Sequence, residues 1–304
     1  MKELIVSMVK IGLRASVVAS MFAQGLAIVP SQFILFRERP HLLLRSLLVV
    51  IFLVPIADLL IILLLKPSPA VAIGLAILAA SPAAPLMLVK VPKSGGSLAY
   101  MASLHLILAL LALLTVPITL DLLSQALGFR AQVGVAAVAK VVGMSILFPV
   151  CLGVVIRSRF AKVADAMSSL LARVGGVVLL ILALFVLVMN FGFLLKMDPW
   201  SYLAMVLVVA TSVAIGHGLG PREPEERTTL AMESASRHPG LAMTIAALNF
   251  SPQKALPVLV PYMLVFIVVT TIYLQWRKRS TTKSVSQSPD MADVDITLSK
   301  GGKS

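Results

Sequence analysis

Long apolar runs separated by short polar or basic stretches make up most of this chain. Runs of about 20 apolar residues have the length of a helix that crosses the hydrocarbon core of a bilayer. These runs lack the period-two alternation of barrel strands, so the pattern predicts an all-α polytopic membrane protein with about ten transmembrane helices. The expected segments are 15–36, 42–65, 67–80, 82–93, 96–124, 133–156, 167–195, 199–219, 225–248 and 255–276.

Two of these segments contain residues that interrupt a helix. Pro82 and Pro85 open the fourth segment, and Pro239 and Gly240 lie in the ninth, at matching places in the two halves of the apolar part. Paired interrupted segments are typical of inverted-repeat transporters, which bind their cargo near the membrane midplane. We therefore predict two inverted five-helix repeats, in which the fourth and ninth helices are broken and cross.

Composition agrees with a membrane protein and argues against a nucleic-acid-binding one. The chain is 59% hydrophobic and only 13% charged, whereas soluble domains are roughly a quarter charged. Its net charge of +13 comes from Lys and Arg at segment ends, where they act as topology signals and contact lipid headgroups. A single cysteine, Cys151, excludes an internal disulfide, and the sequence contains no Cys/His cluster that would indicate a metal site or cofactor.

The apolar part, residues 1–279, is expected to form one transmembrane transporter domain. Its two halves, about 1–130 and 131–279, would be the two repeats. Residues 280–304 are rich in Ser, Thr, Lys and Asp. They are expected to form a disordered polar tail, because such a composition cannot bury enough apolar area to offset the entropy of ordering.

Basic residues also predict how the chain lies in the membrane. Lys10 and Arg14 interrupt the first apolar run, so a signal anchor is expected rather than a cleaved peptide. The positive-inside rule then predicts a multi-pass protein of the cell inner membrane with both termini in the cytoplasm. Arg37, Arg39 and Arg45 in the first loop oppose this assignment.

Glu233, Arg237 and His238 lie inside the ninth segment, directly before Pro239. Hydrocarbon cannot solvate charge, so ionisable residues within a span usually face the bundle interior and mark an ion or substrate path. Pro239 frees backbone polar groups, which are tolerated at membrane depth only where protein or a water-filled cavity satisfies them. The combination predicts a transport site at this break.

The stretch from Arg227 to Ala242 reads Arg-Thr-Thr-Leu-Ala-Met-Glu-Ser-Ala-Ser-Arg-His-Pro-Gly-Leu-Ala. It resembles the ninth-helix motif of the bile acid:sodium symporter superfamily, an Arg-Thr start followed by Glu-x-Gly-x-Gln-Asn-(Ser/Pro)-Gly-Leu-Ala. Met21 to Leu26 is a weaker match in the first segment. The resemblance implies a panel domain and a core domain built from two inverted repeats. It also implies sodium-coupled uptake of organic anions such as bile acids.

The resemblance assigns roles to residues of the ninth segment. Glu233 matches a glutamate that contacts both sodium ions, and Ser234 and Ser236 match positions that offer backbone carbonyls. Arg237 stands where the family has a sodium-coordinating glutamine. His238 stands where the family has an asparagine near the substrate cavity.

Several positions depart from the family pattern. Met87 and Leu88 replace oxygen ligands in the fourth segment, and hydroxyl ligands of the fifth would fall near Met101 and His105. Sodium prefers hard oxygen ligands, and an arginine is a permanent donor that cannot coordinate a cation. Arg237 also follows Glu233 by four residues, so on one helix the two would share a face and pair. We therefore expect the conventional two-sodium coupling to be lost.

Each ionisable residue keeps a second interpretation. Glu233 is either a coupling carboxylate or a member of a structural salt bridge, and Arg237 is either a substrate-anion clamp or the counter-ion of Glu233. His238 either lines the cavity or caps a carbonyl freed at the break. His105 is a candidate proton relay or merely hydrogen-bonded, and Asp58 is expected to form an interhelical hydrogen bond.

The sequence favours a secondary transporter that moves a small organic anion by alternating access without two-sodium coupling. Proton coupling, uniport and exchange stay open, since histidine titrates near neutral pH. A sodium-coupled symporter of the bile-acid type is the alternative, and a channel or membrane sensor is a more remote one. An enzyme is not expected, because no nucleophile–base pair, catalytic carboxylate pair or metal cluster is evident in the sequence.

Overall fold

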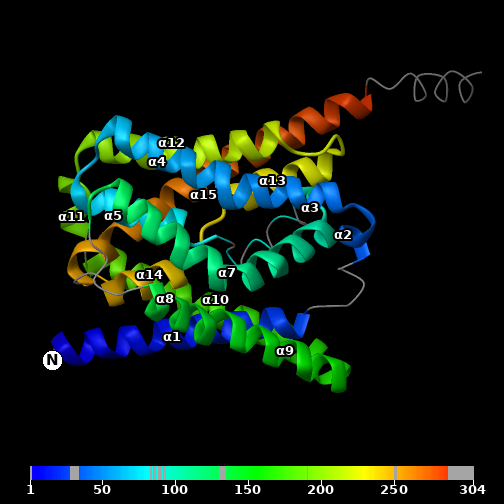
Figure 1. The fold of residues 1–304 in the computed structure, drawn as a ribbon, viewed down its shortest axis with the longest axis horizontal. Helices are drawn as coiled ribbons and strands as arrows, with labels where there is room; N and C mark the ends of the chain where they lie inside the picture. Colours follow the sequence, from blue (N-terminus) through cyan, green and yellow to red (C-terminus); the bar gives the residue numbers. More distant parts are fainter. Residues whose placement is uncertain are drawn as a thin grey trace, which may run out of the picture.

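The chain forms a bundle of helices joined by short connections (Figure 1). The computed structural model describes residues 2–27, 34–82, 84, 87, 91, 94–129, 135–189, 191–249 and 252–286. The helices are α1 (Lys2–Ala27), α2 (Ile34–Glu38), α3 (Pro40–Leu47), α4 (Val54–Leu65), α5 (Pro69–Ala79), α7 (Leu98–Ala126), α8 (Val135–Val142), α9 (Phe148–Arg159), α10 (Ala161–Met189), α11 (Phe191–Lys196), α12 (Pro199–Gly218), α13 (Pro224–Ala235), α14 (Pro239–Asn249) and α15 (Pro252–Ser286), with the π-helical turns η2 (Leu48–Leu53) and η4 (Gly143–Leu147).

Four helical stretches within the described residues are long and apolar enough to cross a membrane: Pro40–Leu65, Leu98–Ala126, Val135–Arg159 and Pro199–Gly218. They agree closely with four of the predicted segments, so the prediction of an all-helical, multi-pass membrane protein is confirmed. In the first and third stretches a proline follows a π-helical turn. A proline ring removes one backbone N–H and crowds the preceding turn, which accounts for the local widening of the helix.

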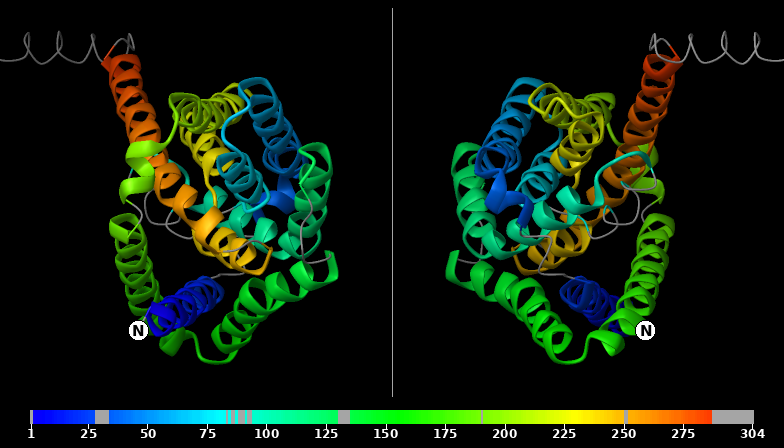
Figure 2. Two further views of the ribbon diagram at one scale, coloured as in Figure 1. Left: turned by 90° about the vertical axis from the view of Figure 1, so that its left-hand side faces the viewer. Right: turned by 90° about the vertical axis from the view of Figure 1, so that its right-hand side faces the viewer.

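The helices are arranged in two layers (Figure 2). We call α1, α8, η4, α9 and α10 the α1 layer, and the remaining helices the core. Small residues bring the α1 layer together: a Cβ on Gly25 would overlap the carbonyl oxygen of Val150 in α9. In addition, the Ser16 hydroxyl donates a 2.7 Å hydrogen bond to the carbonyl oxygen of Gly175 in α10. Close backbone approach of this kind holds membrane helices together through van der Waals packing.

Helix α5 bears on the expected number of membrane crossings. It has 11 residues, and at about 1.5 Å per residue such a helix covers only roughly half of the hydrocarbon core. α5 ends at Ala79, directly before the break at Ser81, and most of the predicted fourth segment, 82–93, lies outside the described residues. In the second half, α13 and α14 are short helices that lie on either side of the corresponding break. The prediction of ten separate transmembrane helices is therefore not confirmed.

The two ends of the helical bundle carry different termini. α1 begins at the end where α11 lies, whereas α15 ends at the opposite end, near α2 and α3 (Figure 1). Arg277 in α15 donates to the carbonyl oxygen of Pro224, and Arg39 pairs with Glu226, which places these residues at that same end. The start of α1 and the end of α15 thus lie at opposite ends of the bundle, whereas the sequence placed both termini on one side; the side that each end faces stays a prediction.

Helix α15 extends past the predicted tenth segment. It runs from Pro252 to Ser286, so the first residues of the expected polar tail are helical. A helix that has already formed extends at low cost, because nucleation is the unfavourable step. The rest of that predicted tail, residues 287–304, lies outside the described residues.

Candidate functional site

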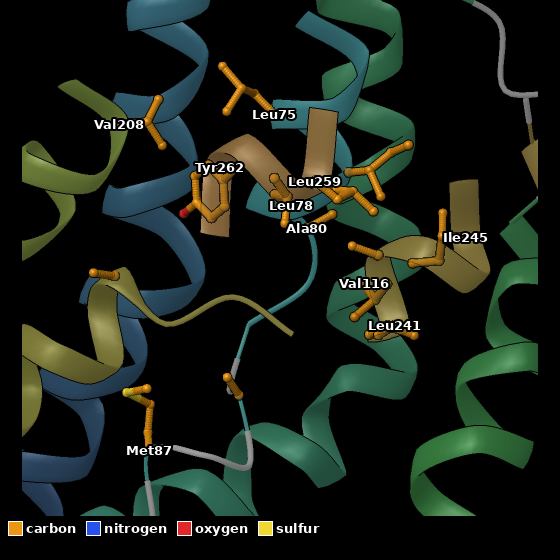
Figure 3. Packing of buried hydrophobic residues seen from close by; sticks show 14 of the residues in the cluster. Leu75, Leu78, Ala80, Met87, Val116, Val208, Leu241, Ile245, Leu259 and Tyr262 are labelled. Carbon is orange, nitrogen blue, oxygen red and sulfur yellow. The ribbon is translucent and has the colours of Figure 1, made fainter. Parts of the chain in front are cut away.

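The two interrupted segments meet at their breaks, as the paired prolines predict. α13 ends at Ala235 and α14 begins at Pro239, and between them Arg237 forms an isolated antiparallel β-bridge with Pro82. Figure 3 shows the two extended stretches beside each other among buried apolar side chains. The crossing therefore lies within the hydrophobic core.

Hydrogen bonds satisfy backbone groups that the broken helices leave free. The backbone N–H of His238 donates to the carbonyl oxygen of Ser81 over 2.7 Å. The backbone N–H of Ala84 donates to the hydroxyl of Ser236 over 2.8 Å. Buried backbone groups must find partners of this kind, so these bonds explain how the crossing is tolerated at this depth.

Glu233 pairs with a histidine rather than with the arginine that follows it. Its Oε1 lies 3.1 Å from Nδ1 of His105 in α7, and the exposed fractions of the two side chains are 0% and 2%. On the other side of the imidazole, Nε2 lies 3.0 Å from Nε2 of Gln24 in α1. The three side chains form a buried hydrogen-bonded chain from α1 through α7 to α13.

The direction of the hydrogen bonds in this chain follows from the chemistry of its groups. The amide nitrogen of Gln24 can only donate, so Nε2 of His105 accepts and carries no proton. The imidazole proton is then on Nδ1, which donates to Glu233. With the ring proton on Nδ1, Glu233 Oε1 is the acceptor of this hydrogen bond.

Arg237 pairs with Asp58 in α4. Its Nη2 lies 2.8 Å from Asp58 Oδ2, with both side chains 1% exposed. The hydroxyl of Ser212 in α12 is 3.5 Å from the other carboxylate oxygen, and Tyr262 in α15 lies near both charges. This second cluster combines one fixed positive and one fixed negative charge inside the core.

The expected pairing of Arg237 with Glu233 is therefore wrong, and the reason is local. The four-residue spacing brings side chains together only along a continuous helix. The helix ends before Ser236, whose backbone is extended (φ −70°, ψ 123°). Successive side chains of an extended stretch point to opposite sides. Arg237 accordingly faces Asp58 in α4, while His238 faces the side on which His105 lies.

His238 caps the first turn of α14. Its Nδ1 accepts a 3.0 Å hydrogen bond from the backbone N–H of Leu241, so it satisfies a freed N–H and not a freed carbonyl as considered from the sequence. Because Nδ1 accepts, the ring proton is on Nε2. Pro239 occupies the first position of α14, where its missing N–H costs nothing.

The hydroxyl groups of the two predicted serines, Ser234 and Ser236, form hydrogen bonds that support the break. The Ser234 hydroxyl donates to the carbonyl oxygen of Leu230 over 2.7 Å. That hydroxyl also lies against Gly216 of α12, where an added Cβ would be 2.5 Å from it. Ser236, as described above, accepts from Ala84.

Four buried polar atoms at the crossing have no hydrogen-bond partner among the described residues. They are Glu233 Oε2, Arg237 Nε, Arg237 Nη1 and His238 Nε2. Buried polar atoms are almost always paired with protein or water, so their concentration here marks a place that water or a ligand completes. No group of three or more His, Cys, Asp or Glu residues within the described residues could hold a metal ion.

Asp58 and Gln24 are the site residues whose partners sequence reasoning missed. The sequence already shows Asp58 as a carboxylate within a predicted span. Arg237 is an arginine within another predicted span, and this could have indicated that the two residues pair. Gln24 belonged to a stretch that resembles a family motif, but nothing in the stretch points to a histidine in α7. Both partners are set by helix packing.

A comparison with protein-family models matches residues 16–197 to the sodium bile acid symporter family. The matched stretch contains Gln24, Asp58 and His105, whereas Glu233 and Arg237 lie beyond it. No curated protein matches the chain. Because the family match covers more than half of the 304 residues, the chain belongs to the sodium bile acid symporter family.

Proposed function

We propose that this protein is a secondary transporter that moves a small organic anion by alternating access and couples this movement to a proton. The observation that carries the proposal is the 3.1 Å hydrogen bond between Glu233 and His105 in a buried position. A carboxylate and an imidazole in contact can hold one exchangeable proton, and imidazole titrates near neutral pH. Buried ionisable groups within spans are typical of such relays.

The charges at the crossing support a proton over two sodium ions. Arg237 and Asp58 neutralise each other, so among the described residues Glu233 is paired with His105 and with no Lys or Arg. An ionised carboxylate that is buried alone is costly, so a mobile cation must accompany it at some stage of the cycle. His105 can deliver a proton directly, whereas Arg237 adds a donor and a positive charge, both unsuited to a sodium site.

The two layers support alternating access. The α1 layer corresponds to the panel and the larger layer to the core that the family resemblance implies. Gln24 reaches from the α1 layer to His105, and Val17 of α1 lies against Gly240 at the start of α14. Movement of the layers against each other would therefore act directly on the crossing and on the proton-carrying pair.

Packing relations between the two halves support an inverted repeat within residues 1–279. The contact of α5 with α15 has a counterpart in the contact of α13 with α7. Likewise, the contact of α4 with α5 has a counterpart in the contact of α12 with α13, and α4 and α12 also pack on each other. A pseudo-twofold axis that exchanges α4 with α12, α5 with α13 and α7 with α15 produces these pairs. The same axis exchanges α1 with α10, so α8 and α9 have no counterpart in the first half.

The distribution of basic residues supports an orientation with the C-terminal end of α15 in the cytoplasm. The bundle end that contains Arg39 and Glu226 carries Arg37, Arg39, Arg45, Arg157, Arg159, Lys162, Arg222, Arg227, Arg277, Lys278 and Arg279. The opposite end carries fewer basic positions, among them Lys2, Lys66, Lys140 and Lys196. By the positive-inside rule, α1 then begins outside. A fluorescent protein fused after α15 would fold and fluoresce only in the cytoplasm.

The coupling ion can be tested by ligand stabilisation and uptake. Thermal-shift titrations with cholate and a set of small carboxylates would first be run in sodium and in potassium at constant ionic strength. The best ligand would then be followed into proteoliposomes under an imposed pH gradient or sodium gradient. We expect uptake to follow the proton gradient, and Glu233→Gln to remove this dependence while Glu225→Gln, on the exposed first turn of α13, retains it.

The sodium-coupled symporter remains the competing function, and its support is the family itself. Saturable stabilisation of the wild-type protein by sodium but not potassium, together with uptake driven by sodium at constant pH, would establish it. In that case the unpartnered Oε2 of Glu233 would be the atom to examine as a sodium ligand.

A further inference from the structure

Gln24 lies at the boundary between the α1 layer and the core, and it is 8% exposed. Its amide nitrogen is 3.0 Å from Nε2 of His105, whose Nδ1 contacts Glu233. We infer that Gln24 is a positioning residue that sets the proton affinity of the His105–Glu233 pair from across the layer boundary. This inference rests on the proton coupling proposed above.

Protonation of His105 changes what Gln24 must offer. In the observed arrangement Nε2 of His105 is an acceptor, and the amide N–H of Gln24 donates to it. When the imidazole binds a proton at Nε2, that nitrogen becomes a donor and can no longer accept. The carboxamide must then turn so that its Oε1 accepts, or the contact between α1 and α7 is lost. One proton gained at Nε2 therefore reverses one hydrogen bond between the layers.

The groups around His105 indicate that Gln24 is the residue whose hydrogen bond to Nε2 would reverse direction. Glu233 from α13 and His238 from the break are the titratable groups described as facing the ring. Glu233 already holds Nδ1, and Nδ1 of His238 is engaged with α14. Gln24 is thus the group that meets Nε2 in both protonation states.

This arrangement links proton binding to the contact between the layers. Binding free energies are reciprocal, so a movement of α1 that withdraws Gln24 changes the proton affinity of the pair, and proton binding changes the strength of the contact by the same factor. An alternating-access transporter driven by protons requires such a link. Gln24 provides it without touching the transported anion.

Two substitutions of Gln24 should shift the proton affinity of the pair in opposite directions. Gln24→Met keeps the approximate shape but offers neither donor nor acceptor. A hydrogen bond to the charged imidazolium is stronger than one to the neutral ring, so its loss disfavours protonation. Gln24→Glu places a second carboxylate at Nε2 and favours protonation. We expect midpoints about one pH unit lower and higher than wild type, a roughly tenfold change in proton affinity each way.

The experiment uses the full chain, labelled with ¹⁵N-histidine and reconstituted in lipid nanodiscs. NMR reports which ring nitrogen of His105 carries the proton, with His105→Asn to assign its signal among the four histidines. The midpoint would be compared among wild type, Gln24→Met, Gln24→Glu and the control Gln125→Met. Gln125 is exposed and bonds to Asp121 at the end of α7, so its loss should leave the midpoint unchanged.

The outcomes separate this inference from the proposed function. Opposite shifts for the two Gln24 variants, with no shift for Gln125→Met, support it. A wild-type pair that titrates while both Gln24 variants match the control, or shift in the same direction, overturns the role of Gln24 and leaves proton coupling standing. A wild-type His105 that does not titrate between about pH 5 and 8 overturns the proton coupling and this inference together.

Discussion

The buried pair of Asp58 and Arg237 provides the sharpest test of the site geometry. Both side chains are 1% exposed and their closest atoms are 2.8 Å apart. Asp58→Asn would leave the guanidinium charge without its counter-ion, in a site where two of its nitrogens already lack partners. Arg237→Gln would leave the carboxylate with the hydroxyl of Ser212 at 3.5 Å.

Removing one partner of a buried ion pair costs on the order of 3–5 kcal/mol, while replacing both can be nearly neutral. We therefore expect each single substitution to destabilise the protein by roughly that amount. The double variant Asp58→Asn/Arg237→Gln should be more stable than either single variant, because two neutral amides can hydrogen-bond without stranding a charge. The stability gain of the double variant is the quantity that identifies the pair.

The measurement is a double-mutant cycle on unfolding free energies of the purified protein in detergent, with expression and monodispersity matched. A second cycle with Glu233→Gln and Arg237→Gln is the control, since these two residues are not in contact in this fold. Rescue of Glu233→Gln by Arg237→Gln, without rescue of Asp58→Asn, would refute the assignment. It would show that the arginine pairs along the chain and that the helix is not broken at Ser236.

Three further predictions follow from other contacts. In a Cys151→Ser background, Val17→Cys and Gly240→Cys should form a disulfide that joins the layers and stops transport until it is reduced, because a Cβ at 240 would reach the Val17 side chain. Gly25→Leu should prevent close packing of α1 on α9 and lower the unfolding temperature, whereas Gly25→Ala should have a smaller effect. Asp198→Ala should destabilise α12 by about 1 kcal/mol at neutral pH, through loss of its N-cap. Hydrogen bonding from Ser201 lowers the pKa of Asp198, so its contribution is present above the unfolded pKa and lost as pH falls through the folded pKa, and the variant should match wild type in acid.

The sequence alone determined the class of fold and the location of the breaks. Apolar runs of spanning length require helices in hydrocarbon, because every backbone group must be satisfied within the segment. Pro82 and Pro239 lack the backbone N–H that continues a helix. Their positions in the sequence therefore locate the breaks to within a residue or two. The family resemblance in the ninth segment likewise singled out Glu233 and its neighbours as the residues of interest.

Tertiary structure decided which charges meet and how many spans the chain makes. Arg237 and Glu233 are close in sequence, yet one extended residue between them turns the arginine toward Asp58, 179 positions away along the chain. In a hydropathy pattern, the two halves of a broken span look like two separate short helices. Only the tertiary structure, in which both halves meet at the crossing, shows that they belong to one span. Hydrophobic patterning specifies which face of a helix is buried, whereas the identity of a polar partner depends on the angle and register at which two helices pack.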